Sequence, residues 1–549
     1  MAHADEGPDV DEGLPANLGR SAAVMAVGTT LSRITGLGRL VAMAIALGVT
    51  ESRLADSYNV ANTMPNVIYE LILGGLLTSV FIPVLVEELR KKRDDDAWES
   101  VSALVTTSLV TVVAITVLVV IGAPWIIRLF TFRLSGEVRA EQQELATFFL
   151  RIFAPQIAFY GIASIAGGLL NAHDRFAVPM FAPILNNVVV IATLLAFAAF
   201  VPLRLDEPAS LAQKLLLGVG TTAGVAILAL AHWPAVRRLP GKLRWRPDFR
   251  HPSVRKLARL SLWTLGYVVA NQLSFSVGLV LAYDVEGGVT AMFIAFAFFN
   301  LPYGIAAVSI MTALVPRMSS QAVEGDEDGF RGSVGSAMRL MGLLLLPATA
   351  GYLVLSRPLV TTLLEHGVME AESSELVAEV LNMFAIGLVP FSFYLLLLRA
   401  FYARQDAKTP TLVNVVLNTV YAVFSFILFP VFRVQGLAFA HSLCYFSGAL
   451  LAGILLSRRI GGLGTRRTLA ALSRAAIASF VAAVAMVVAL QGVNALMDPS
   501  GERALVQLVA GVLAGGVAFL VAAKALRIEE LDTLRNLLPG RSPASSGLG

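Results

Sequence analysis

The sequence predicts an all-α polytopic membrane protein, and three observations support that prediction. The chain has 549 residues, of which 56% are hydrophobic and only 15% are charged. Its mean hydropathy is +0.73, which no soluble domain of this length is expected to reach. Long apolar segments recur along the chain, and each is long enough to cross a hydrocarbon core about 30 Å thick as a helix. The composition therefore excludes a soluble globular protein.

Fourteen apolar segments appear when hydropathy is averaged over about 19 residues, and we interpret each as a transmembrane helix. Their approximate limits are 21–49, 57–87, 100–128, 142–171, 177–203, 211–233, 257–282, 287–316, 335–356, 376–400, 409–432, 434–457, 470–492 and 504–526. Residues 1–20 are acidic, lack the basic start of a signal peptide, and are expected to form a disordered cytoplasmic tail. Residues 527–549 are expected to form a second cytoplasmic tail, in which Ile528, Leu531 and Leu538 are spaced like one face of a surface helix.

The distribution of charge predicts the orientation. Basic runs at 90–93, 237–256 and 458–467 fall in loops on one side of the membrane, whereas the loop at 365–375 on the other side carries four glutamates. The positive-inside rule places the basic loops in the cytoplasm, and an even number of helices then places both termini there. The net charge of +4 is explained by these loops, so nucleic acid is not an expected partner.

An internal repeat predicts two lobes. The stretch "NAHDRFAVPMFAPILNNVV" (171–189) aligns without gaps with "YARQDAKTPTLVNVVLNTV" (402–420), and a looser similarity joins "FIPVLVEE" (81–88) to "LVPRMSSQ" (314–321). Both pairs join helices six apart, which indicates a parallel repeat about an axis along the membrane normal. The expected parts are an N-lobe of helices 1–6 (21–233), a basic cytoplasmic linker (234–256), a C-lobe of helices 7–12 (257–457), and helices 13 and 14 with their preceding basic loop (458–526).

The first helix carries two arginines at membrane depth, Arg33 and Arg39. Each costs roughly 2.5–3.5 kcal/mol on an insertion scale, so their presence requires an explanation. On a straight helix they would point about 120° apart, but Gly36 and Gly38 permit a bend that brings them toward one side. They either snorkel to opposite interfaces or pair with a carboxylate, or they line a cationic cavity between the lobes and bind an anion such as pyrophosphate.

Acidic residues are scarce within the predicted helices. Glu70 is the clear carboxylate near the midplane, and Asp56 lies at the outer end of the same helix, so both are candidate partners for the arginines. This balance favours an anionic cargo over an organic cation. Asn66 is a candidate cargo contact, although interhelical hydrogen bonding is the usual role of asparagines such as Asn187, Asn271, Asn414 and Asn418 in membrane helices.

Signals for catalysis are absent from the sequence. It contains no Walker A, H-E-x-x-H or G-x-S-x-G motif, its histidines lack metal-ligand spacing, and Cys444 is its only cysteine. We therefore expect a protein that is not an enzyme and that has neither a metal site nor a cofactor.

Three stretches resemble the MurJ (MviN) family of lipid II flippases, within the multidrug/oligosaccharidyl-lipid/polysaccharide exporter superfamily. They are "LSRITGLGR", "ANTMPNVIYELILGGLLTSVFIPVL" and "FYARQDAKTP" (401–410), and the similarity extends over essentially the whole chain after residue 20. It implies two six-helix lobes plus two extra helices, a central cavity lined by Arg33 and Arg39, and an acidic position at Asp56. The third stretch contributes Arg404, Asp406, Lys408 and Pro410, which we expect to have structural or gating roles.

The chain also departs from the family pattern. Members often have two arginines just after the "PN" of helix 2, where this chain has Tyr69 and Glu70, and an arginine in helix 8, where it has Ala297. The expected cavity is therefore less cationic than usual, and recognition of pyrophosphate would depend mainly on helix 1.

The expected function is transport of lipid II, the undecaprenyl-pyrophosphate-linked peptidoglycan precursor, across a bacterial cytoplasmic membrane by alternating access. The alternatives are a flippase for another polyprenyl-linked glycan, a non-transporting scaffold of cell-wall synthesis, and a cation-drug antiporter. The expected partners are this lipid cargo, membrane lipids and proteins of cell-wall synthesis. The energy source is expected to be the membrane potential or a monovalent cation.

The arginine hypothesis predicts that Arg33→Ala abolishes growth complementation in a depletion strain while the protein remains inserted and abundant. Arg33→Lys should rescue growth poorly, because an ammonium group lacks the planar fork that binds phosphate through two parallel hydrogen bonds. Growth and membrane abundance would be measured together. Full activity of the alanine variant would favour snorkelling.

Overall fold

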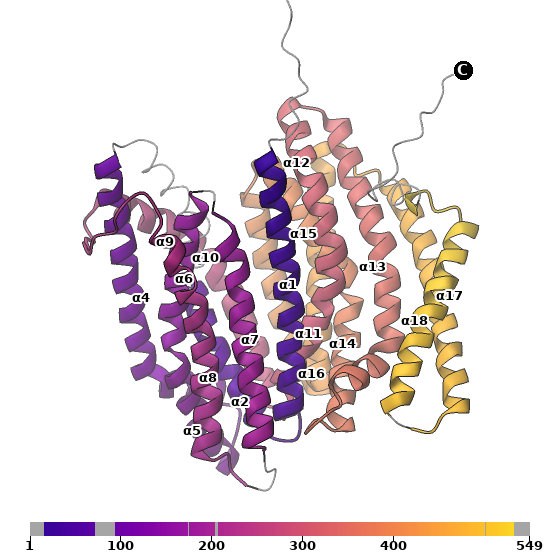
Figure 1. The fold of residues 1–549 in the computed structure, drawn as a ribbon. Coiled ribbons are helices and arrows are strands. Elements are labelled where there is room, and N and C mark those ends of the chain that lie inside the picture. The colour runs from indigo at the N-terminus through magenta and orange to yellow at the C-terminus, as the bar shows by residue number, and fades with distance from the viewer. Residues whose placement is uncertain (1–15, 72–93, 174, 204–206, 500, 532–549) are drawn as a thin grey trace, which may run out of the picture. The chain divides into compact units, whose positions relative to one another are not determined.

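A computed structural model describes the chain except residues 1–15, 72–93, 174, 204–206, 500 and 532–549. Within the described residues every regular element is a helix (Figure 1). Ten of these helices are long and apolar enough to cross a membrane, and the pair α14 and α15, bent by 46° at a short break, forms an eleventh span if it is counted as one. The predicted class, an all-α polytopic membrane protein, is confirmed.

The described residues form two compact units. The first consists of residues up to 43 together with 61–126 and 146–268, and the second of 44–60, 127–145 and 269 onward. Helices in or entering the first unit are α1 (Ala16–Leu47), α2 (Leu54–Tyr69), α4 (Asp94–Phe130), α5 (Gly136–Phe153), α6 (Pro155–Asn171), α7 (Ala177–Phe200), α8 (Leu211–Leu230), α9 (Trp233–Val236) and α10 (Pro252–Ala282).

The second unit contains the remaining helices. They are α11 (Gly288–Pro302), the π-helix η3 (Tyr303–Ala307), α12 (Val308–Glu324), α13 (Glu327–Leu364), α14 (Ala371–Ile386), α15 (Leu388–Ala403), α16 (Lys408–Ile460), α17 (Thr465–Leu496) and α18 (Gly501–Ala525). The π-helix directly follows Pro302, whose ring cannot donate a backbone hydrogen bond, and α11, η3 and α12 together make one span over Gly288–Glu324.

Several expected segments differ from the structure or lie outside its described part. Helix α1 begins at Ala16, inside the stretch expected to be a disordered tail. Residues 1–15, the 81–88 half of the looser repeat and Leu538 are outside the described residues. The predicted lobe boundaries remain predictions.

Helix α16 contains two of the predicted spans, 409–432 and 434–457. A straight helix of its 53 residues would be about 80 Å long, far more than a membrane requires. The chain instead turns at Arg433, which has φ 50° and ψ −130°. A Cβ added to Gly448 would come within 2.8 Å of Leu417, so the two halves of α16 lie side by side.

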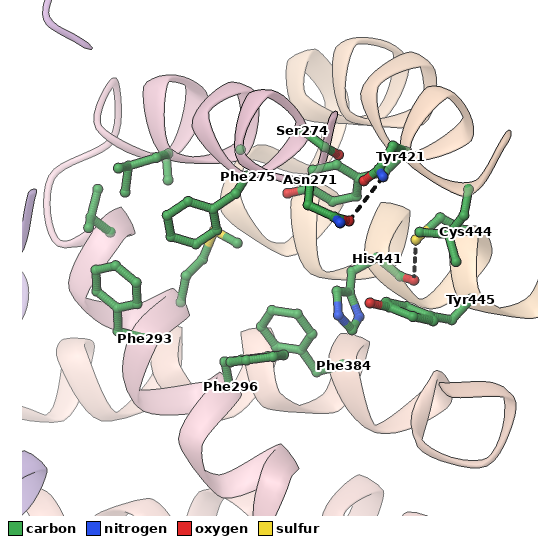
Figure 2. A pocket seen from close by; sticks show the side chains of 17 residues that line it. Asn271, Ser274, Phe275, Phe293, Phe296, Phe384, Tyr421, His441, Cys444 and Tyr445 are labelled. Carbon is green, nitrogen blue, oxygen red and sulfur yellow. Dashed lines mark hydrogen bonds between the residues drawn. The ribbon is translucent and has the colours of Figure 1, made fainter. Parts of the chain in front are cut away.

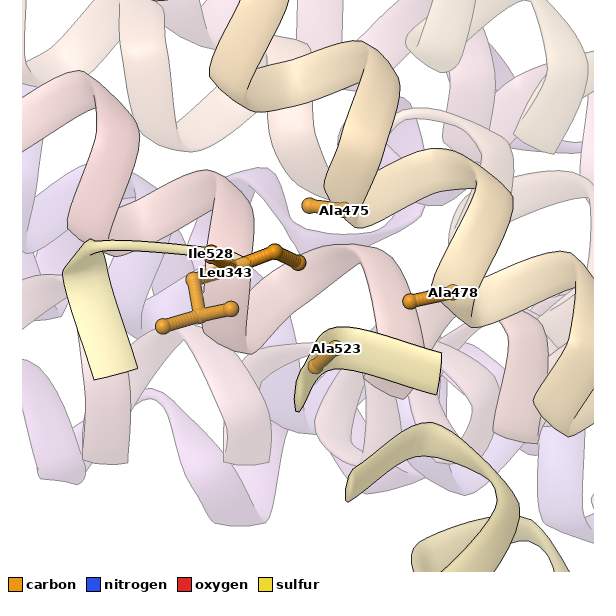
Figure 3. Packing of buried hydrophobic residues seen from close by; sticks show 5 residues of the cluster. All are labelled: Leu343, Ala475, Ala478, Ala523 and Ile528. Atoms are coloured by element: carbon orange, nitrogen blue, oxygen red, sulfur yellow. The ribbon is translucent and has the colours of Figure 1, made fainter. Parts of the chain in front are cut away.

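The second unit also encloses the segment that follows α18. Ile528 is 5% exposed and packs with Leu343 of α13, Ala475 and Ala478 of α17, and Ala523 of α18 (Figure 3). Leu531 packs against the same cluster. These side chains were expected on the membrane surface, but the small alanines of α17 and α18 leave room for them between the helices.

Glycines allow helices of the first unit to pack closely, as is common in membranes. On α8, a Cβ added to Gly224 would lie 2.6 Å from Oδ1 and 3.1 Å from the backbone oxygen of Asn186 on α7. Gly220, one turn earlier, meets Thr193 of α7 in the same way. The contact between α7 and α8 therefore requires small residues at these positions.

This packing predicts that Gly224→Leu lowers the free energy of unfolding by about 1–3 kcal/mol, the usual cost of overpacking. The measurement is unfolding of the purified protein in detergent, followed by intrinsic fluorescence. Gly122→Leu on α4 is the matched control, because its nearest neighbour to an added Cβ is 4.0 Å away. An equal loss in both variants would contradict the packing argument.

Candidate functional site

A short hairpin between α1 and α2 carries a buried carboxylate that caps another helix. We call residues 48–56 the acid hairpin. Oδ1 of Asp56 accepts hydrogen bonds from the Thr290 backbone N–H at 2.9 Å and from the Thr290 hydroxyl at 2.7 Å. The N-cap residue of α11, Gly287, provides no side-chain cap. Asp56 therefore supplies from α2 the acceptor that the first turn of α11 lacks.

Polar side chains surround this contact. Asn59 donates to the Thr290 hydroxyl at 3.0 Å. The Ser57 hydroxyl contacts Gln142 and lies 2.8 Å from the Tyr283 hydroxyl, which in turn donates to Gln142 at 3.2 Å. Asp56 is completely buried, and its Oδ2 has no hydrogen-bond partner among the described residues.

The second carboxylate of the acid hairpin caps α14. Oε1 of Glu51 accepts from the Glu370 backbone N–H at 2.6 Å and from the Ser373 hydroxyl at 2.7 Å. Thr50 adds two contacts to the Ser373 hydroxyl, from its backbone N–H at 2.9 Å and from its own hydroxyl at 2.7 Å. The N-cap residue Glu370 makes no side-chain cap of its own. We call these contacts with α11 and α14 the clasp.

The clasp lies entirely within the second unit. Residues 44–60 belong to that unit, whereas the rest of α1 and α2 belongs to the first. Gly287, with φ 72°, lets the chain approach the backbone oxygen of Val49, where a Cβ would lie 2.7 Å away. Glycine is favoured at this position for two reasons. It adopts a positive φ readily, and it has no side chain that would clash with Val49.

The two arginines of α1 lie in the first unit. Helix α1 is continuous through Gly36 and Gly38. Both glycines face α7, where an added Cβ would lie 3.7 Å from Asn187 and 3.5 Å from Ile191. Asn187 donates to the Ser32 backbone oxygen at 3.2 Å and to the Thr35 hydroxyl at 3.0 Å, which confirms the predicted interhelical role of this asparagine.

Arg33 is exposed and Arg39 is half-buried. Within the described residues, neither arginine forms an ion pair with a carboxylate. The two residues are six positions apart on a continuous helix, so their side chains leave it about 120° apart. The structure therefore does not bring them together at a single point in this conformation.

The other expected cargo contacts of the first unit are on α2 and directly after it. Asn66 and Glu70 are both exposed. Tyr69, which stands where an arginine was expected from the family pattern, contacts the Ser164 hydroxyl and packs against the Tyr160 ring at a centroid distance of 5.8 Å. Tyr69 thus joins the end of α2 to α6.

The second unit contains a neutral pocket of about 230 Å³ (Figure 2). Its polar groups come from Asn271, Ser274, Asn418, Tyr421 and His441, and it is also lined by the aromatic rings of Phe275, Phe293, Phe296 and Phe384. The rings of Phe296 and Phe384 pack against the His441 ring, at centroid distances of 5.6 and 5.0 Å. No charged side chain is among its lining residues. Such a pocket can accept an uncharged polar group, but it provides no cation to compensate a pyrophosphate.

Three asparagines join α10 to α16 at the edge of this pocket. Oδ1 of Asn271 accepts from Asn414 at 3.2 Å and from Asn418 at 3.1 Å, and Asn418 also donates to Asn414 at 2.9 Å. The predicted interhelical hydrogen bonding is confirmed for these residues. Among the described residues, no group of three or more His, Cys, Asp or Glu side chains is arranged to hold a metal ion.

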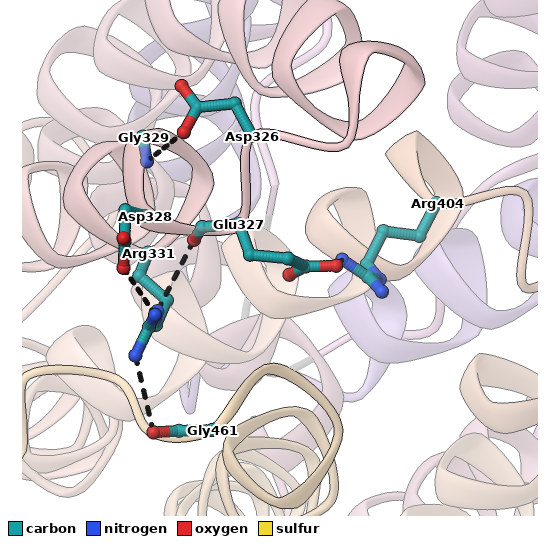
Figure 4. Close-up of polar contacts among 7 residues, drawn as sticks. All are labelled: Asp326, Glu327, Asp328, Gly329, Arg331, Arg404 and Gly461. Atoms are coloured by element: carbon teal, nitrogen blue, oxygen red, sulfur yellow. Dashed lines mark hydrogen bonds and ion pairs between the residues drawn. The ribbon is translucent and has the colours of Figure 1, made fainter.

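The motif at 401–410 connects α15 to α16 by ionic contacts and caps. Arg404 binds both carboxylate oxygens of Glu327 on α13, at 2.7 and 2.8 Å (Figure 4). Asp406 accepts from the backbone N–H groups of Lys408 and Thr409 at the start of α16 and pairs with Arg459 near its end.

The charged residues Asp406 and Lys408 of the 401–410 motif differ in their surroundings. Burial alone would raise the pKa of the Asp406 carboxyl, but hydrogen bonds from Thr409 and the Arg459 guanidinium lower it to about 2. Lys408 is exposed, and Pro410 is buried in the first turn of α16, where its missing N–H is no loss.

The two copies of the tighter repeat share local backbone structure. Three hydrogen bonds of the first copy, His173 to Leu170, Arg175 to Leu170 and Met180 to Phe176, recur 231 residues later in the second copy. They recur there as Arg404 to Phe401, Asp406 to Phe401 and Thr411 to Ala407. These loops are therefore the same turn in two places.

Comparison with known proteins identifies the family. A family model described as "Lipid II flippase MurJ" matches residues 43–506. The chain belongs to the MurJ family. The lipid II flippase MurJ of Burkholderia cenocepacia is 29% identical over 452 residues, which cover 80% of this chain and 83% of that protein. The probable lipid II flippase MurJ of Synechocystis is 28% identical over 538 residues, which cover 95% of this chain and 97% of that protein.

Solved structures agree on the fold. A lipid II flippase MurJ in an inward closed conformation has a TM-score of 0.74 at 20% identity and covers 92% of this chain and 100% of that one. An inward-facing multidrug resistance transporter of the MATE family has a TM-score of 0.62 at 16% identity and covers 81% of this chain and 99% of that one. The MurJ family is one of transporters, so the expectation that this chain is not an enzyme is confirmed.

Most of the clasp could not be predicted from the sequence. Asp56 was a candidate, but Glu51, Thr290 and Ser373 were not, because these residues become neighbours only through folding. The sequence offered one indication of the clasp. Two helices begin after Gly287 and Glu370, neither of which is a good capping residue, and a short loop elsewhere carries carboxylates that could cap them.

The capping contact predicts that Asp56→Ala destabilises the protein by about 1–3 kcal/mol, because it leaves the buried Thr290 N–H and hydroxyl without an acceptor. Asp56→Asn keeps an oxygen at that position and should cost less. Thermal unfolding in detergent measures both variants. Asp284→Ala, which breaks the more exposed pair with Arg133, is the control and should have little effect. Equal stability of Asp56→Ala and the wild type would refute the capping role.

Proposed function

We propose that this chain flips lipid II from the inner to the outer leaflet of a bacterial cytoplasmic membrane. The observation that carries the proposal is the match of the MurJ family model over 43–506. The curated relatives from Burkholderia cenocepacia and Vibrio cholerae bear the same function in their names. Another polyprenyl-linked glycan as the cargo, a scaffold of cell-wall synthesis, or a cation-drug antiporter is less favoured by these relatives.

The proposed architecture is fourteen membrane helices in two parallel six-helix lobes with two additional helices, and both termini in the cytoplasm. The recurring hydrogen bonds of the loops at 171–180 and 402–411 support the repeat.

The proposed role of Arg33 and Arg39 is to bind the pyrophosphate of the cargo in a polar cavity while the prenyl tail remains in lipid. A guanidinium suits this role because it stays charged and donates parallel hydrogen bonds to phosphate oxygens. The absence of an ion-pair partner for either side chain within the described residues leaves them available. Glu70 and Asn66 are proposed to contact the sugar and peptide part of the head.

The clasp is proposed to be the outer gate. Its contacts are hydrogen bonds to helix ends, which can break and re-form without repacking an apolar core. Asp56 then acts primarily in the gate. We propose no cofactor, and the energy would come from the membrane potential or a monovalent cation. Membrane lipids and proteins of cell-wall synthesis remain the proposed partners besides the cargo.

Depletion of the protein in its host tests the cargo. We expect lipid II to accumulate and to remain inaccessible to probes added outside the cell, and expression of the wild type but not of Arg33→Ala should reverse this. Accumulation of a different polyprenyl-linked glycan would reassign the cargo. Normal lipid II export with disordered wall assembly would support the scaffold.

The gate predicts that a disulfide across the clasp stops transport. The hydroxyl oxygens of Thr50 and Ser373 are 2.7 Å apart, so Thr50→Cys with Ser373→Cys, in a Cys444→Ala background, should form a bond with little rearrangement. Oxidation should block export of lipid II, and a reductant should restore it. Export would be measured in cells or in vesicles before and after reduction.

The matched control is a disulfide that leaves the clasp free. Asn494 and Gln507, whose side chains are 2.6 Å apart at the turn between α17 and α18, provide it as Asn494→Cys with Gln507→Cys. That crosslink should not change export. Complete crosslinking of the Thr50 and Ser373 positions with undiminished export would exclude the clasp as a gate.

A further inference from the structure

A second polar cavity, of about 540 Å³, lies in the second unit, away from both the clasp and the neutral pocket. It is found where α12 ends and where α13 and α17 begin. Four arginines line it, together with Asp328, glycines and serines of α13 and the Gly464 end of the preceding loop. We call it the arginine pocket, and its arginines are Arg317, Arg331, Arg339 and Arg467.

The N-terminus of a long helix lies at this pocket, because Gly464 and Arg467 are among its lining residues. Helix α17 has 32 residues, and its N-cap residue Gly464 makes no side-chain cap. The first turn of such a helix carries unpaired N–H groups and a partial positive charge, which together bind phosphate and other anions. Helix α13 differs, because Asp326 caps it through the Gly329 N–H at 2.8 Å (Figure 4).

One buried polar group beside the pocket has no hydrogen-bond partner among the described residues. It is the Thr468 hydroxyl, on a residue that is 5% exposed. Gly335 lines the pocket, and a Cβ added there would lie 3.1 Å from Nη1 of Arg339 and 3.7 Å from the Thr468 hydroxyl. A buried hydroxyl without a partner is costly, so this hydroxyl supports the presence of a ligand.

The charges near the pocket are only partly balanced. Arg331 pairs with Asp328, Arg339 lies 2.9 Å from Glu530, and Arg467 lies 3.2 Å from Glu529. Within the described residues Arg317 has no ion pair. A guanidinium has five N–H donors, so each paired arginine can still donate to a second anion.

We propose that the arginine pocket binds a phosphate-bearing anion, either the phosphodiester headgroup of an anionic membrane lipid or a soluble phosphate. The lipid is favoured by position, because the pocket lies at the ends of apolar helices long enough to span a membrane, and basic pockets between such helices bind lipid headgroups. Glu529 and Glu530, which follow α18, compete with this anion for Arg467 and Arg339.

Binding to the full-length protein in neutral detergent tests the site. The probes are dihexanoyl phosphatidylglycerol, inorganic phosphate, and dihexanoyl phosphatidylcholine as the zwitterionic comparison. Phosphatidylglycerol should bind saturably, and Arg467→Gln and Arg317→Gln should each weaken it about tenfold, the loss of one charge-assisted hydrogen bond. Thr468→Val should weaken it several-fold.

Arg466→Gln is the matched control, because it removes the same charge from the adjacent residue, which does not line the pocket. It should change the affinity less than twofold. An equal loss of affinity in the Arg466 and Arg467 variants would show that only the general surface charge matters, and it would overturn the proposal. Equal affinity for inorganic phosphate and phosphatidylglycerol would assign the site to a soluble phosphate.

The competing glutamates provide a variant that should gain affinity. Glu530→Gln frees Arg339 from its partner and should strengthen phosphatidylglycerol binding several-fold, and the more exposed Glu529→Gln should do so without disturbing the fold. Unchanged affinity in both variants, or no saturable binding by the wild type, would show that the arginines serve only their internal ion pairs.

Discussion

The arrangement of helices in the second unit depends on one carboxylate that caps a helix to which it does not belong. Asp56 lies in the first turn of α2, yet it accepts the backbone N–H and the hydroxyl of Thr290 in the first turn of α11. A helix end buried without a partner would be costly, so the position of α11 is tied to the position of the hairpin. Glu51 caps the start of α14 in the same way. Gly287, which has no side chain, permits the close approach of the hairpin backbone at Val49.

Polar contacts also orient the other helices of the second unit. Apolar packing gives little direction in a membrane, because lipid tails are as apolar as leucine side chains. Orientation is provided instead by the asparagines between α10 and α16, by Arg404 on Glu327, and by Asp406 at the start of α16. Small residues then let the helices close around these contacts, as Ala475, Ala478 and Ala523 do around Ile528.

Hydropathy was sufficient to predict the class of fold, since length and apolarity are properties of each helix alone. The interhelical role of Asn187 and Asn271 could also be predicted, because a buried amide in lipid must find a partner. The partners themselves could not, since Thr290 and Ser373 are hundreds of residues from the hairpin. Gly36 and Gly38 were expected to permit a bend, and their contact with α7 could not be predicted, because it depends on a helix about 150 residues further along the chain. The arginine pocket escaped prediction because its four arginines come from three segments of the chain.

The borrowed caps have a consequence for the open state. If the clasp is the proposed gate, withdrawal of the hairpin uncovers the first turns of α11 and α14. Helix α14 keeps Glu372 in its first turn, whereas α11 has no acidic residue there. Helix α11 would then present bare N–H groups and the positive end of its dipole to the opening. Its start would attract an anionic headgroup as the gate opens, and the returning Asp56 carboxylate would displace that headgroup as the gate closes.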